Sequence, residues 1–500
     1  MPSSPSSATA VLDAIIVGAG PSGLAASLAL AGWRPHYVPK CTVEDDQLAQ
    51  RLQALLHRSP SGLLESAAVP ALSNGLRGRS NNPAALLFDA LHHPGADSQR
   101  VPNPRCCLEL RHDPTAALSH VLLDPQKPGG SWHGMHEATR TLSPGTWLQL
   151  PPPAPGLADH LLARESGLTP AAAVQAAAAR QPRSLIAGYY EAVADRFGAA
   201  VPHRSERVVA VRWNESGRNE ADANADECRA DATWTVELAD APPLRARSLV
   251  LAVGTAGLPR RLGIEGEDLP LVAHRCTEPS DGAHVVLVVG AGLSAADCLV
   301  HHLQRGRQVY HLFRGAVEAT KVGSKFGAAA AAGFYPEYYA LTRAMAGGTR
   351  MRLLGGEYEP LQGAELRAVR PDGRCLLGLA GGDGDGVREV RADAVAVLIG
   401  SGPDLRFLPP EVLSALEAAG PPPDEHEGVK ATHPVHVEVD PWSAEAKAWP
   451  TLHCLGPLRG DNFARFAIHD GYGVSEAIRA RSKAAERGDA PSPAEAAADR

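Results

Sequence analysis

GAGPSG, residues 18–23, is the stretch that decides the fold, and it directly follows an apolar run that begins at Val11. A second stretch, GAGLSA at residues 290–295, follows another apolar run that begins near His284. Glycines between a strand and a helix allow a tight turn and the close approach of a pyrophosphate, so this pattern indicates a dinucleotide-binding unit. One match is a weak signal, but two in full context are much stronger. The sequence therefore predicts an α/β protein with two dinucleotide-binding, Rossmann-like domains, and an enzyme that passes electrons between two nucleotide cofactors.

Each glycine of the first fingerprint has its own expected task. Gly18 permits the tight turn, Gly20 lets the backbone approach a pyrophosphate, and Gly23 lets the helix pack closely on the sheet. The helix that follows directs its positive N-terminus at the anion. An acidic residue is expected about 20 positions later, where it would hold a ribose hydroxyl. The second apolar run, residues 35–38, ends without one, and Glu44 is the nearest acid but a poor candidate.

In the second fingerprint the third glycine is replaced by Ala295, a permitted variant. The next predicted strand, Gln308–Phe313, ends in Arg314, where a site for NAD would carry an acid. A guanidinium at this position suits the 2′-phosphate of NADP, so the sequence favours NADPH over NADH. Two alternatives stay open: Arg314 is a solvated strand-end arginine, or Arg305 and Arg307 bind the same phosphate.

The strand and helix signals divide the chain into a discontinuous first domain, an inserted second domain and two tails. Turns at residues 253–255 and 399–401 each follow an apolar strand and indicate the crossings between the domains. The first domain is predicted at 11–257, with an insertion at 41–128, and returns at 403–485; the second domain is predicted at 283–402, and residues 1–10 and 486–500 are predicted to be disordered.

Composition excludes several classes of function. The chain has 500 residues and a formal net charge of −8, which argues against general binding to nucleic acid or anionic membranes. No apolar stretch approaches the roughly 20 residues that span a bilayer, and the start lacks a secretory signal, so we expect a soluble, cytoplasmic protein. The eight cysteines are scattered, without a C-x-x-C pair or zinc-ligand spacing. This pattern predicts reduced thiols and no metal site, and it disfavours a flavoprotein disulfide reductase.

Several further motifs carry a resemblance to known families. With the turn GGSW at 129–132 and Arg314, the two fingerprints resemble the FAD- and NADPH-dependent, FMO-like monooxygenases. A more specific set of segments spreads over residues 14–480 and is similar to the oxidative stress-induced growth inhibitor family. These segments are GRS at 78–80, ALLFDAL at 85–91, PGGSWH at 128–133, YPEY at 335–338, LIGSGPDL at 398–405 and GPLRGDNF at 456–463.

The resemblance implies FAD in the first domain, NADPH in the second, and a role in oxidative stress, growth restraint and cell death. It implies that NADPH reduces the flavin, that O₂ adds to it, and that the hydroperoxide so formed transfers one oxygen atom to a small, soft nucleophile. The implied FAD residues are Gly18, Gly20, Pro21, Ser22, Gly23, Gly130, Trp132 and Asp461; the implied NADPH residues are Gly290, Gly292, Ser294, Ala295 and Arg314.

The sequence departs from the FMO-like pattern in two places. The F-x-G-x-x-x-H signature is not intact, since IEGEDLP at 264–270 leads to His274 at a different spacing. The asparagine that those enzymes place over the flavin is not evident; Ser143 lies near the expected position and Asn462 is a possible substitute, so both are catalytic candidates. Two other functions therefore stay open: an NADPH oxidase that releases hydrogen peroxide, and a regulatory scaffold that binds a protein partner through the 41–128 insertion.

Overall fold

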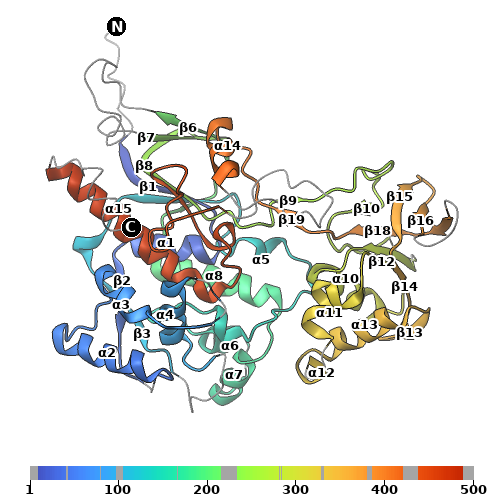
Figure 1. Cartoon of the computed structure of the whole chain (residues 1–500), viewed down its shortest axis with the longest axis horizontal. Coiled ribbons are helices and arrows are strands. Elements are labelled where there is room, and N and C mark those ends of the chain that lie inside the picture. The colour runs from blue at the N-terminus through green and yellow to red at the C-terminus, as the bar shows by residue number, and fades with distance from the viewer. Residues whose placement is uncertain are drawn as a thin grey trace, which may run out of the picture.

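The computed structural model describes residues 10–40, 43–78, 80, 82–96, 105–165, 167–214, 233–280, 282, 284–327, 331–379, 386–419 and 437–487. Figure 1 shows two bodies side by side, a larger one at the left and a smaller one at the right. Residues 1–9 and 488–500 of the predicted tails lie outside the described ranges. Within those ranges, no helix is both long and apolar enough to cross a membrane.

The first domain is built on one seven-stranded sheet. Apolar runs such as VLDAIIV in β1 form its buried parallel centre, as expected where helices cover both faces of a parallel sheet. The strand order is β5 (His203–Arg204), β4 (His120–Leu123), β1 (Val11–Val17), β8 (Leu244–Leu251), β7 (Thr233–Leu238) and β6 (Val208–Asn214), and β20 (Leu452–Cys454) also pairs with β8. Strands β5, β4, β1, β8 and β20 pair with one another in parallel, whereas β6, β7 and β8 form an antiparallel meander.

Helices α1 (Pro21–Leu30) and α15 (Ala467–Arg487) pack against each other beside this sheet (Figure 1). Their contact is very close, because a Cβ on Gly471 would lie 2.5 Å from the carbonyl carbon of Ala25. Helix α15 therefore fixes the C-terminal segment against the helix of the first fingerprint. The described part of the first domain also contains α5 (Ser131–Gly134), α6 (Leu157–Arg164), α7 (Pro170–Ala177), α8 (Arg183–Phe197) and α14 (Pro410–Ala419).

The insertion in the first domain has different limits from those predicted. A Rossmann-like unit places the strand after its first helix beside the first strand, but β2 (Trp33–Tyr37), which contains most of the apolar run 35–38, pairs antiparallel with β3 (Leu108–His112) in a separate ribbon. The chain thus leaves the main sheet after α1 and returns to it only at β4, which the prediction had included in the insertion. The limits of the insertion differ because the neighbour of β1 is β4, and not the first apolar run after the helix. Helices α2 (Asp46–Arg58), α3 (Val69–Ser73) and α4 (Pro83–His92) belong to the insertion.

The second domain has three layers. Its central sheet has the order β10 (Val272–Ala273), β18 (Ala394–Val397), β11 (Val285–Val289), β12 (Gln308–Phe313), β14 (Gly356–Gln362) and β13 (Met351–Leu353), parallel except for the last pair. One apolar core joins this sheet to α10 (Leu293–Gln304), α11 (Lys321–Phe326) and α13 (Pro336–Gly347), with α12 (Ala331–Phe334) beside them. A second core joins its other face to the antiparallel sheet β15 (Glu365–Val369), β16 (Arg374–Gly378) and β17 (Val387–Arg391).

Two short antiparallel strands, β9 (Leu258–Pro259) and β19 (Ser401–Gly402), lie where the chain crosses between the domains (Figure 1). The crossings lie close to the predicted turns. The predicted start of the second domain at 283 is too late, however, because β10 already pairs with β18 in its sheet. The predicted fold class, α/β with a second Rossmann-like domain inserted into a discontinuous first one, is confirmed.

Candidate functional site

Two glycines of the first fingerprint are required by the protein itself. Gly18 has a φ of +107°, and a Cβ on it would lie 2.4 Å from the Ala252 carbonyl oxygen of the neighbouring strand end. A Cβ on Gly23 would lie only 1.9 Å from the Gly18 carbonyl oxygen. Both positions therefore need glycine for the turn and for helix packing, as predicted, whether or not a ligand binds.

The middle glycine of each fingerprint is different. Gly20 has an ordinary φ of −73°, and a Cβ on it would meet only the Cα of Gly130, at 4.0 Å. Gly292 has a φ of −87°, and no described neighbour lies within 4 Å of a Cβ built on it. Neither backbone conformation nor packing in the described chain requires glycine at these two positions. The open space above them fits a pyrophosphate that approaches the backbone.

Both fingerprint helices present free N–H groups at their first turn. Gly20 is the N-cap of α1 and Gly292 is the N-cap of α10, so neither helix has a side chain that caps it. Neither helix carries an acidic residue in its first turn. The exposed N–H groups and the helix dipole therefore favour an anion at both places.

Two other segments meet the first fingerprint, as the predicted site requires. The Gly129 N–H donates to the Ala19 carbonyl oxygen at 2.8 Å, and a Cβ on Gly130 would lie 2.9 Å from the Cα of Gly20. From the C-terminal segment, a Cβ on Gly456 would lie 2.5 Å from Ser22 Oγ. The motifs that begin at residues 128 and 456 thus lie against one turn. Trp132 follows in α5, where it packs against the main apolar core, and Pro21 begins α1.

Asp124 is a further candidate for the first site, and the sequence pattern did not indicate it. It directly follows β4, the strand beside β1, and its Oδ2 accepts a hydrogen bond of 2.8 Å from the Ala19 N–H. This is the strand-end position at which an acid is expected to hold a ribose hydroxyl, so Asp124 replaces Glu44 as the candidate. The expected acid lies about 20 residues after the fingerprint. In this chain the insertion lies between α1 and β4, so Asp124 is much farther from Gly20 in the sequence. One sequence feature could have indicated Asp124: it is an acid that directly follows the short apolar run 120–123 and shortly precedes PGGSW.

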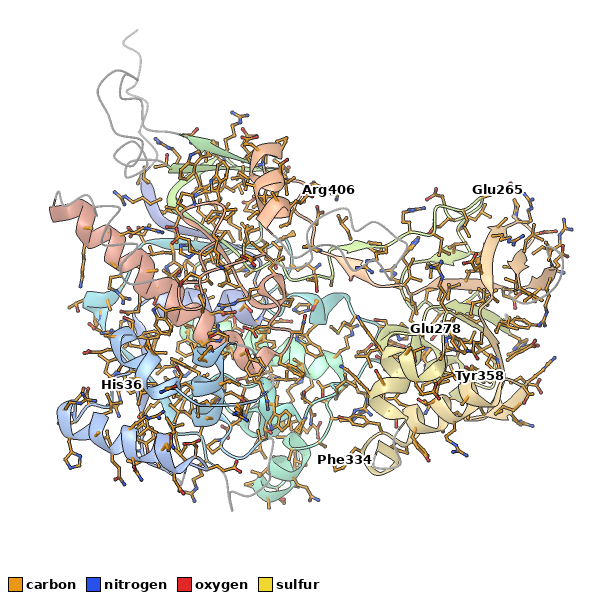
Figure 2. The ribbon with its side chains drawn as sticks, viewed as in Figure 1. His36, Glu265, Glu278, Phe334, Tyr358 and Arg406 are labelled. Atoms are coloured by element: carbon orange, nitrogen blue, oxygen red, sulfur yellow. The ribbon has the colours of Figure 1, made fainter. Side chains whose placement is uncertain are left out.

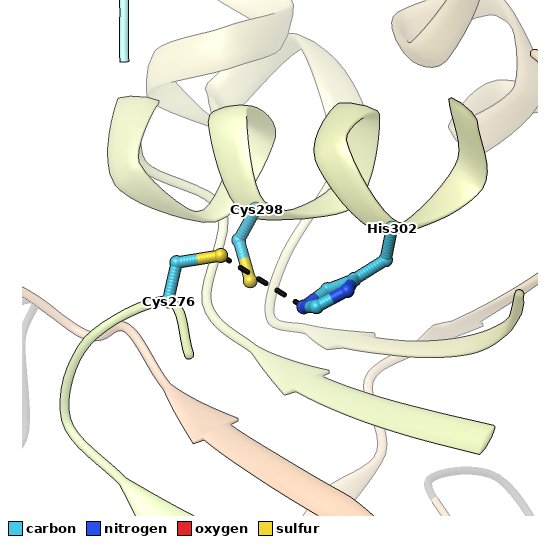
Figure 3. Close-up of side chains that lie close together, drawn as sticks. All are labelled: Cys276, Cys298 and His302. Atoms are coloured by element: carbon cyan, nitrogen blue, oxygen red, sulfur yellow. Dashed lines mark hydrogen bonds between the residues drawn. The ribbon is translucent and has the colours of Figure 1, made fainter. Parts of the chain in front are cut away.

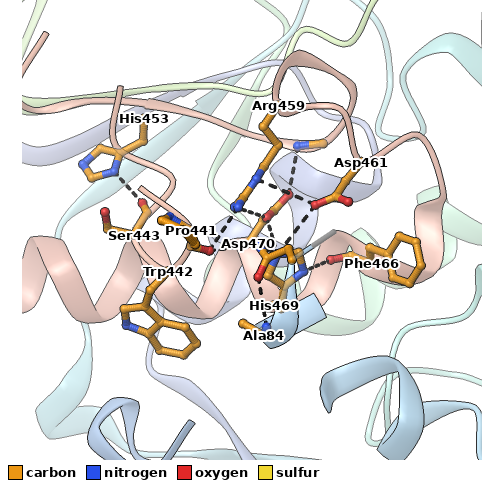
Figure 4. Close-up of polar contacts among 12 residues, drawn as sticks. Ala84, Pro441, Trp442, Ser443, His453, Arg459, Asp461, Phe466, His469 and Asp470 are labelled. Atoms are coloured by element: carbon orange, nitrogen blue, oxygen red, sulfur yellow. Dashed lines mark hydrogen bonds and ion pairs between the residues drawn. The ribbon is translucent and has the colours of Figure 1, made fainter. Parts of the chain in front are cut away.

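The predicted cofactor residue Asp461 has its carboxylate in a buried polar network (Figure 4). Ser80 Oγ donates to Asp461 Oδ1 at 2.9 Å, and Arg459 Nε lies 3.7 Å from Oδ2. Arg459 also donates to Asp470, whose Oδ2 accepts the Gly456 N–H, both at 2.8 Å. Burial raises the pKa of Asp470, but His469 and Arg459 outweigh it and lower that pKa below its ordinary value. The network therefore connects Asp461, through Arg459 and Asp470, to the turn at Gly456.

The two catalytic candidates lie in different surroundings. Asn462 is exposed, and its Nδ2 donates to the Gly460 carbonyl oxygen at 3.1 Å. Ser143 is half-buried, its carbonyl accepts from Thr141 Oγ1 at 2.7 Å, and its neighbour Leu142 packs against the second domain. Ser143 thus belongs to the junction between the domains, whereas Asn462 belongs to the surface of the loop before α15.

The second fingerprint and Arg314 lie at the same edge of the central sheet. Gly290 has a φ of +126°, and a Cβ on it would lie 2.2 Å from the Leu398 carbonyl oxygen, so it makes the turn. Ser294 is exposed and Ala295 is fully buried. Arg314 directly follows β12, is 62% exposed, and lies 3.7 Å from Glu365. Its guanidinium is thus available to an anion.

Arg305 and Arg307 cannot serve the same phosphate. Both follow the C-terminal end of α10, whereas the fingerprint lies at its N-terminus. Arg307 donates to Glu278 at 2.7 Å, and Arg305 Nη1 lies 2.8 Å from His301 Nδ1. This alternative from the sequence analysis is therefore wrong, because the two arginines are a helix length away from the turn.

The domains contact each other beside this site. Arg180 of the first domain forms an ion pair of 2.5 Å with Glu337 of the second, and Tyr335 donates to the Leu142 carbonyl oxygen at 2.6 Å. The His136 and His301 rings lie 4.4 Å apart, next to Glu278, which Figure 2 shows on the side of the second domain that faces the first. Polar and aromatic contacts thus join the two domains beside the two fingerprints.

Comparisons with known proteins agree with this geometry. A family model described as pyridine nucleotide-disulphide oxidoreductase matches residues 158–326. Oxidative stress-induced growth inhibitor 1 of Homo sapiens is 32% identical to this chain, over 93% of this chain and 95% of the human one.

Solved flavoprotein structures share the fold. The bacillithiol disulfide reductase of Bacillus cereus has a TM-score of 0.54 at 16% identity, over 94% of this chain and all of the other. The ornithine N-hydroxylase of Kutzneria sp. 744, described with reduced FAD, NADP⁺ and L-ornithine, has a TM-score of 0.51 at 13% identity, over 95% of this chain and all of the other. The chain therefore has the fold of FAD-dependent oxidoreductases.

Proposed function

The chain belongs to the oxidative stress-induced growth inhibitor family, and from this premise we propose that it is an FAD-containing oxidoreductase that consumes NADPH. We propose further that it is a monooxygenase, which transfers one oxygen atom of O₂ to a small, soft nucleophile during the response to oxidative stress. The names of its relatives support the stress and growth context, and the fold supports the redox class.

One observation carries the proposal. Neither the backbone conformation nor the packing of the described protein requires glycine at positions 20 and 292, because the φ values of Gly20 and Gly292 are ordinary and a Cβ would meet open space. Glycine costs backbone entropy relative to alanine. The cost is understandable if a phosphate group must lie against the backbone at each place, and two such places in one chain indicate two nucleotide cofactors.

The residues present fit both groups. Residues 18–23 with the free N–H groups of α1 would hold the pyrophosphate of FAD, and the Asp124 carboxylate would accept from a ribose hydroxyl. Gly130 and Gly456 hold their segments against the same turn. Gly292, Ser294 and Arg314 would hold the phosphates of NADPH. When bound, FAD would take a hydride from NADPH and pass electrons to O₂.

An absorption spectrum of the purified chain tests the proposal. We expect flavin bands that bleach on anaerobic addition of NADPH. The Gly20→Ala variant should lose the flavin yet melt within a few degrees of the flavin-free wild-type chain, since alanine at an N-cap costs only about 1 kcal/mol. Gly23→Ala is the matched control, because its clash at 1.9 Å should unfold the domain and not merely empty it.

No flavin in the wild-type chain, even after FAD is added back, would overturn the proposal. It would favour a regulatory scaffold that works through a protein partner. A Gly20→Ala variant that retained full flavin occupancy would also contradict the pyrophosphate position.

A second candidate function is favoured by the place of Asn462. This side chain is exposed and bound to Gly460 within its own loop, so the asparagine of FMO-like enzymes has no buried counterpart at this position. An enzyme of this kind would oxidise NADPH and release hydrogen peroxide. Measured oxygen uptake and peroxide yield distinguish the two: equal amounts indicate the oxidase, whereas a deficit of peroxide indicates oxygen transfer to a substrate.

A further inference from the structure

Two cysteines and a histidine come together in the second domain (Figure 3). Cys276 lies between β10 and β11, whereas Cys298 and His302 lie one turn apart on α10. Both sulfur atoms and a ring nitrogen lie within 4.8 Å of one another, and all three side chains are buried. The eight cysteines are scattered along the sequence, but the fold brings two of them together because the segment after β10 lies beside α10.

The hydrogen bonds fix the tautomer of His302. Arg307 Nη1 lies 2.7 Å from His302 Nδ1, and a guanidinium can only donate, so Nδ1 accepts. Burial, with the charges of His301 and Arg307, lowers the pKa of His302 to about 3, and the ring is therefore neutral. Its one proton is on Nε2, which lies 3.8 Å from Cys276 Sγ and donates to it.

This tautomer is unsuited to a metal ion and well suited to a thiolate. A metal would need the lone pair of Nε2, where the proton is, and the other nitrogen faces a guanidinium. Cys276, by contrast, receives the N–H of His302. Hydrogen bonding to Cys276 and burial raise the pKa of Cys298 well above its ordinary value, so Cys298 stays a thiol that donates to Cys276. Cys276 is thus the better nucleophile of the pair.

We propose that Cys276 and Cys298 form a redox pair that hydrogen peroxide, or another small hydroperoxide, converts into a reversible intramolecular disulfide. The Cys276 thiol gives up its proton, its sulfur attacks one peroxide oxygen while the O–O bond breaks, and the hydroxide that leaves takes that proton as the first water, so that Cys276 becomes a sulfenic acid. Cys298 then attacks the sulfenic sulfur, the S–S bond forms, and its proton leaves with the hydroxyl group as water. The balance is two thiols and one hydrogen peroxide to one disulfide and two waters. The reaction takes peroxide from solution and does not depend on the proposed function.

The geometry allows the bond with a small movement. The sulfur atoms must approach from within 4.8 Å to about 2.05 Å. Cys298 is fixed in a buried turn of α10, but Cys276 lies outside any helix or strand and is 9% exposed. Formation of the bond requires the segment around Cys276 to shift toward α10, and Cys276 is the less completely buried of the two thiols, so a small peroxide meets it first.

Peptide mapping of the full chain tests the proposal. The protein is treated with equimolar hydrogen peroxide, denatured, blocked with iodoacetamide, digested and analysed by mass spectrometry. We expect a peptide pair joined through Cys276 and Cys298 that dithiothreitol separates. In Cys298→Ser, dimedone should label Cys276. The buried thiols Cys375 and Cys454, whose pKa values burial raises to about 11 and about 12, are internal controls and should remain alkylated.

A second variant tests the role of the histidine. His302→Phe keeps a ring but removes the N–H donor, so the loss of the Cys276 thiol should slow at least about tenfold; Arg307→Met, which frees the tautomer, should slow it less. Three results would overturn the proposal in a folded protein: no joined peptide at any peroxide concentration, oxidation of Cys375 at the same rate, or one equivalent of bound zinc or copper that Cys276→Ser abolishes.

Discussion

Arg180 and Glu337, 2.5 Å apart, tie the two nucleotide domains together through one partly buried ion pair. The Arg180 guanidinium also lies over the rings of Tyr335 and Tyr338, at 5.0 and 5.2 Å from their centroids, and donates to the Tyr338 hydroxyl. The YPEY motif at 335–338 is thus a structural contact at the start of α13. Its part in the family resemblance is explained by the domain junction.

Breaking this pair should cost more than breaking an exposed one. Because the side chains of Arg180 and Glu337 are only 18% and 23% exposed, we expect a coupling energy of about 1–3 kcal/mol in a double-mutant cycle with Arg180→Ala and Glu337→Ala. The pair Arg350–Glu357, with both side chains 52% exposed, is the control and should give less than about 0.5 kcal/mol. Urea unfolding measures both, and equal values would contradict a special role for the junction.

Asp297 should make the protein less stable at neutral pH than at acidic pH. Burial, the largest cause, raises the pKa of Asp297 from 3.8 to about 6. The stability that this group contributes is therefore complete below pH 3.8 and is lost as the pH rises through 6. Asp297→Asn keeps an acceptor for Tyr338, so it should stabilise the protein by at most about 3 kcal/mol above pH 6.

The measurement is urea unfolding of wild type and Asp297→Asn between pH 4 and 8. The two curves should meet near pH 4 and separate as the pH rises. A constant difference across the range would show that Asp297 does not titrate as burial dictates.

Alanine substitutions at the two glycines of the second fingerprint should affect different properties, the stability of the domain for Gly290 and the affinity for NADPH for Gly292. Gly290→Ala puts a Cβ 2.2 Å from the Leu398 carbonyl oxygen at a φ of +126°, so it should destabilise the domain by several kcal/mol, an order-of-magnitude value for steric strain. Gly292→Ala meets open space, and should keep the melting temperature but weaken NADPH at least about tenfold. Calorimetry and nucleotide titration separate the two; normal NADPH affinity in Gly292→Ala would remove the phosphate from this turn.

Arg314→Ala should reduce the preference for NADPH over NADH. Loss of a charged hydrogen bond to the 2′-phosphate costs about 1.5–3 kcal/mol, which corresponds to roughly 10- to 150-fold in Kd for NADPH with NADH unchanged. Arg305→Ala is the matched control, because Arg305 lies beyond the far end of α10. Equal losses for both nucleotides would mean that Arg314 does not bind this phosphate.

The sequence predicted what depends on neighbouring residues. Both strand-turn-helix units, the α/β class and the inserted second domain followed from apolar runs and glycines within about 15 positions of each other, the range over which such patterns are informative. Asp124 was missed because an insertion separates β4 from α1, and only the sheet order shows that β4 lies beside β1.

Contacts between segments that are distant in the sequence could not be predicted from local patterns of apolar residues and glycines. Cys276 and His302 meet because a segment outside regular structure lies beside α10 in space. Arg180 reaches Glu337 only after two domains have folded and docked. No periodicity or local motif records such meetings. The position of Asp461 was predicted near the site, but its partners Ser80 and Arg459 emerged only from packing.

The paired strands β9 and β19 have a consequence for how the chain is assembled. Leu258 pairs with Gly402, so the polypeptide enters and leaves the second domain at neighbouring points, and a Cβ on Gly257 would lie 2.9 Å from the Asp404 backbone nitrogen. A domain whose two ends lie this close together can be inserted, exchanged or removed without a large change in the rest of the chain. A short hairpin in place of residues 260–400 would join the same two strands, and the flavin half of the molecule would keep an unbroken sheet.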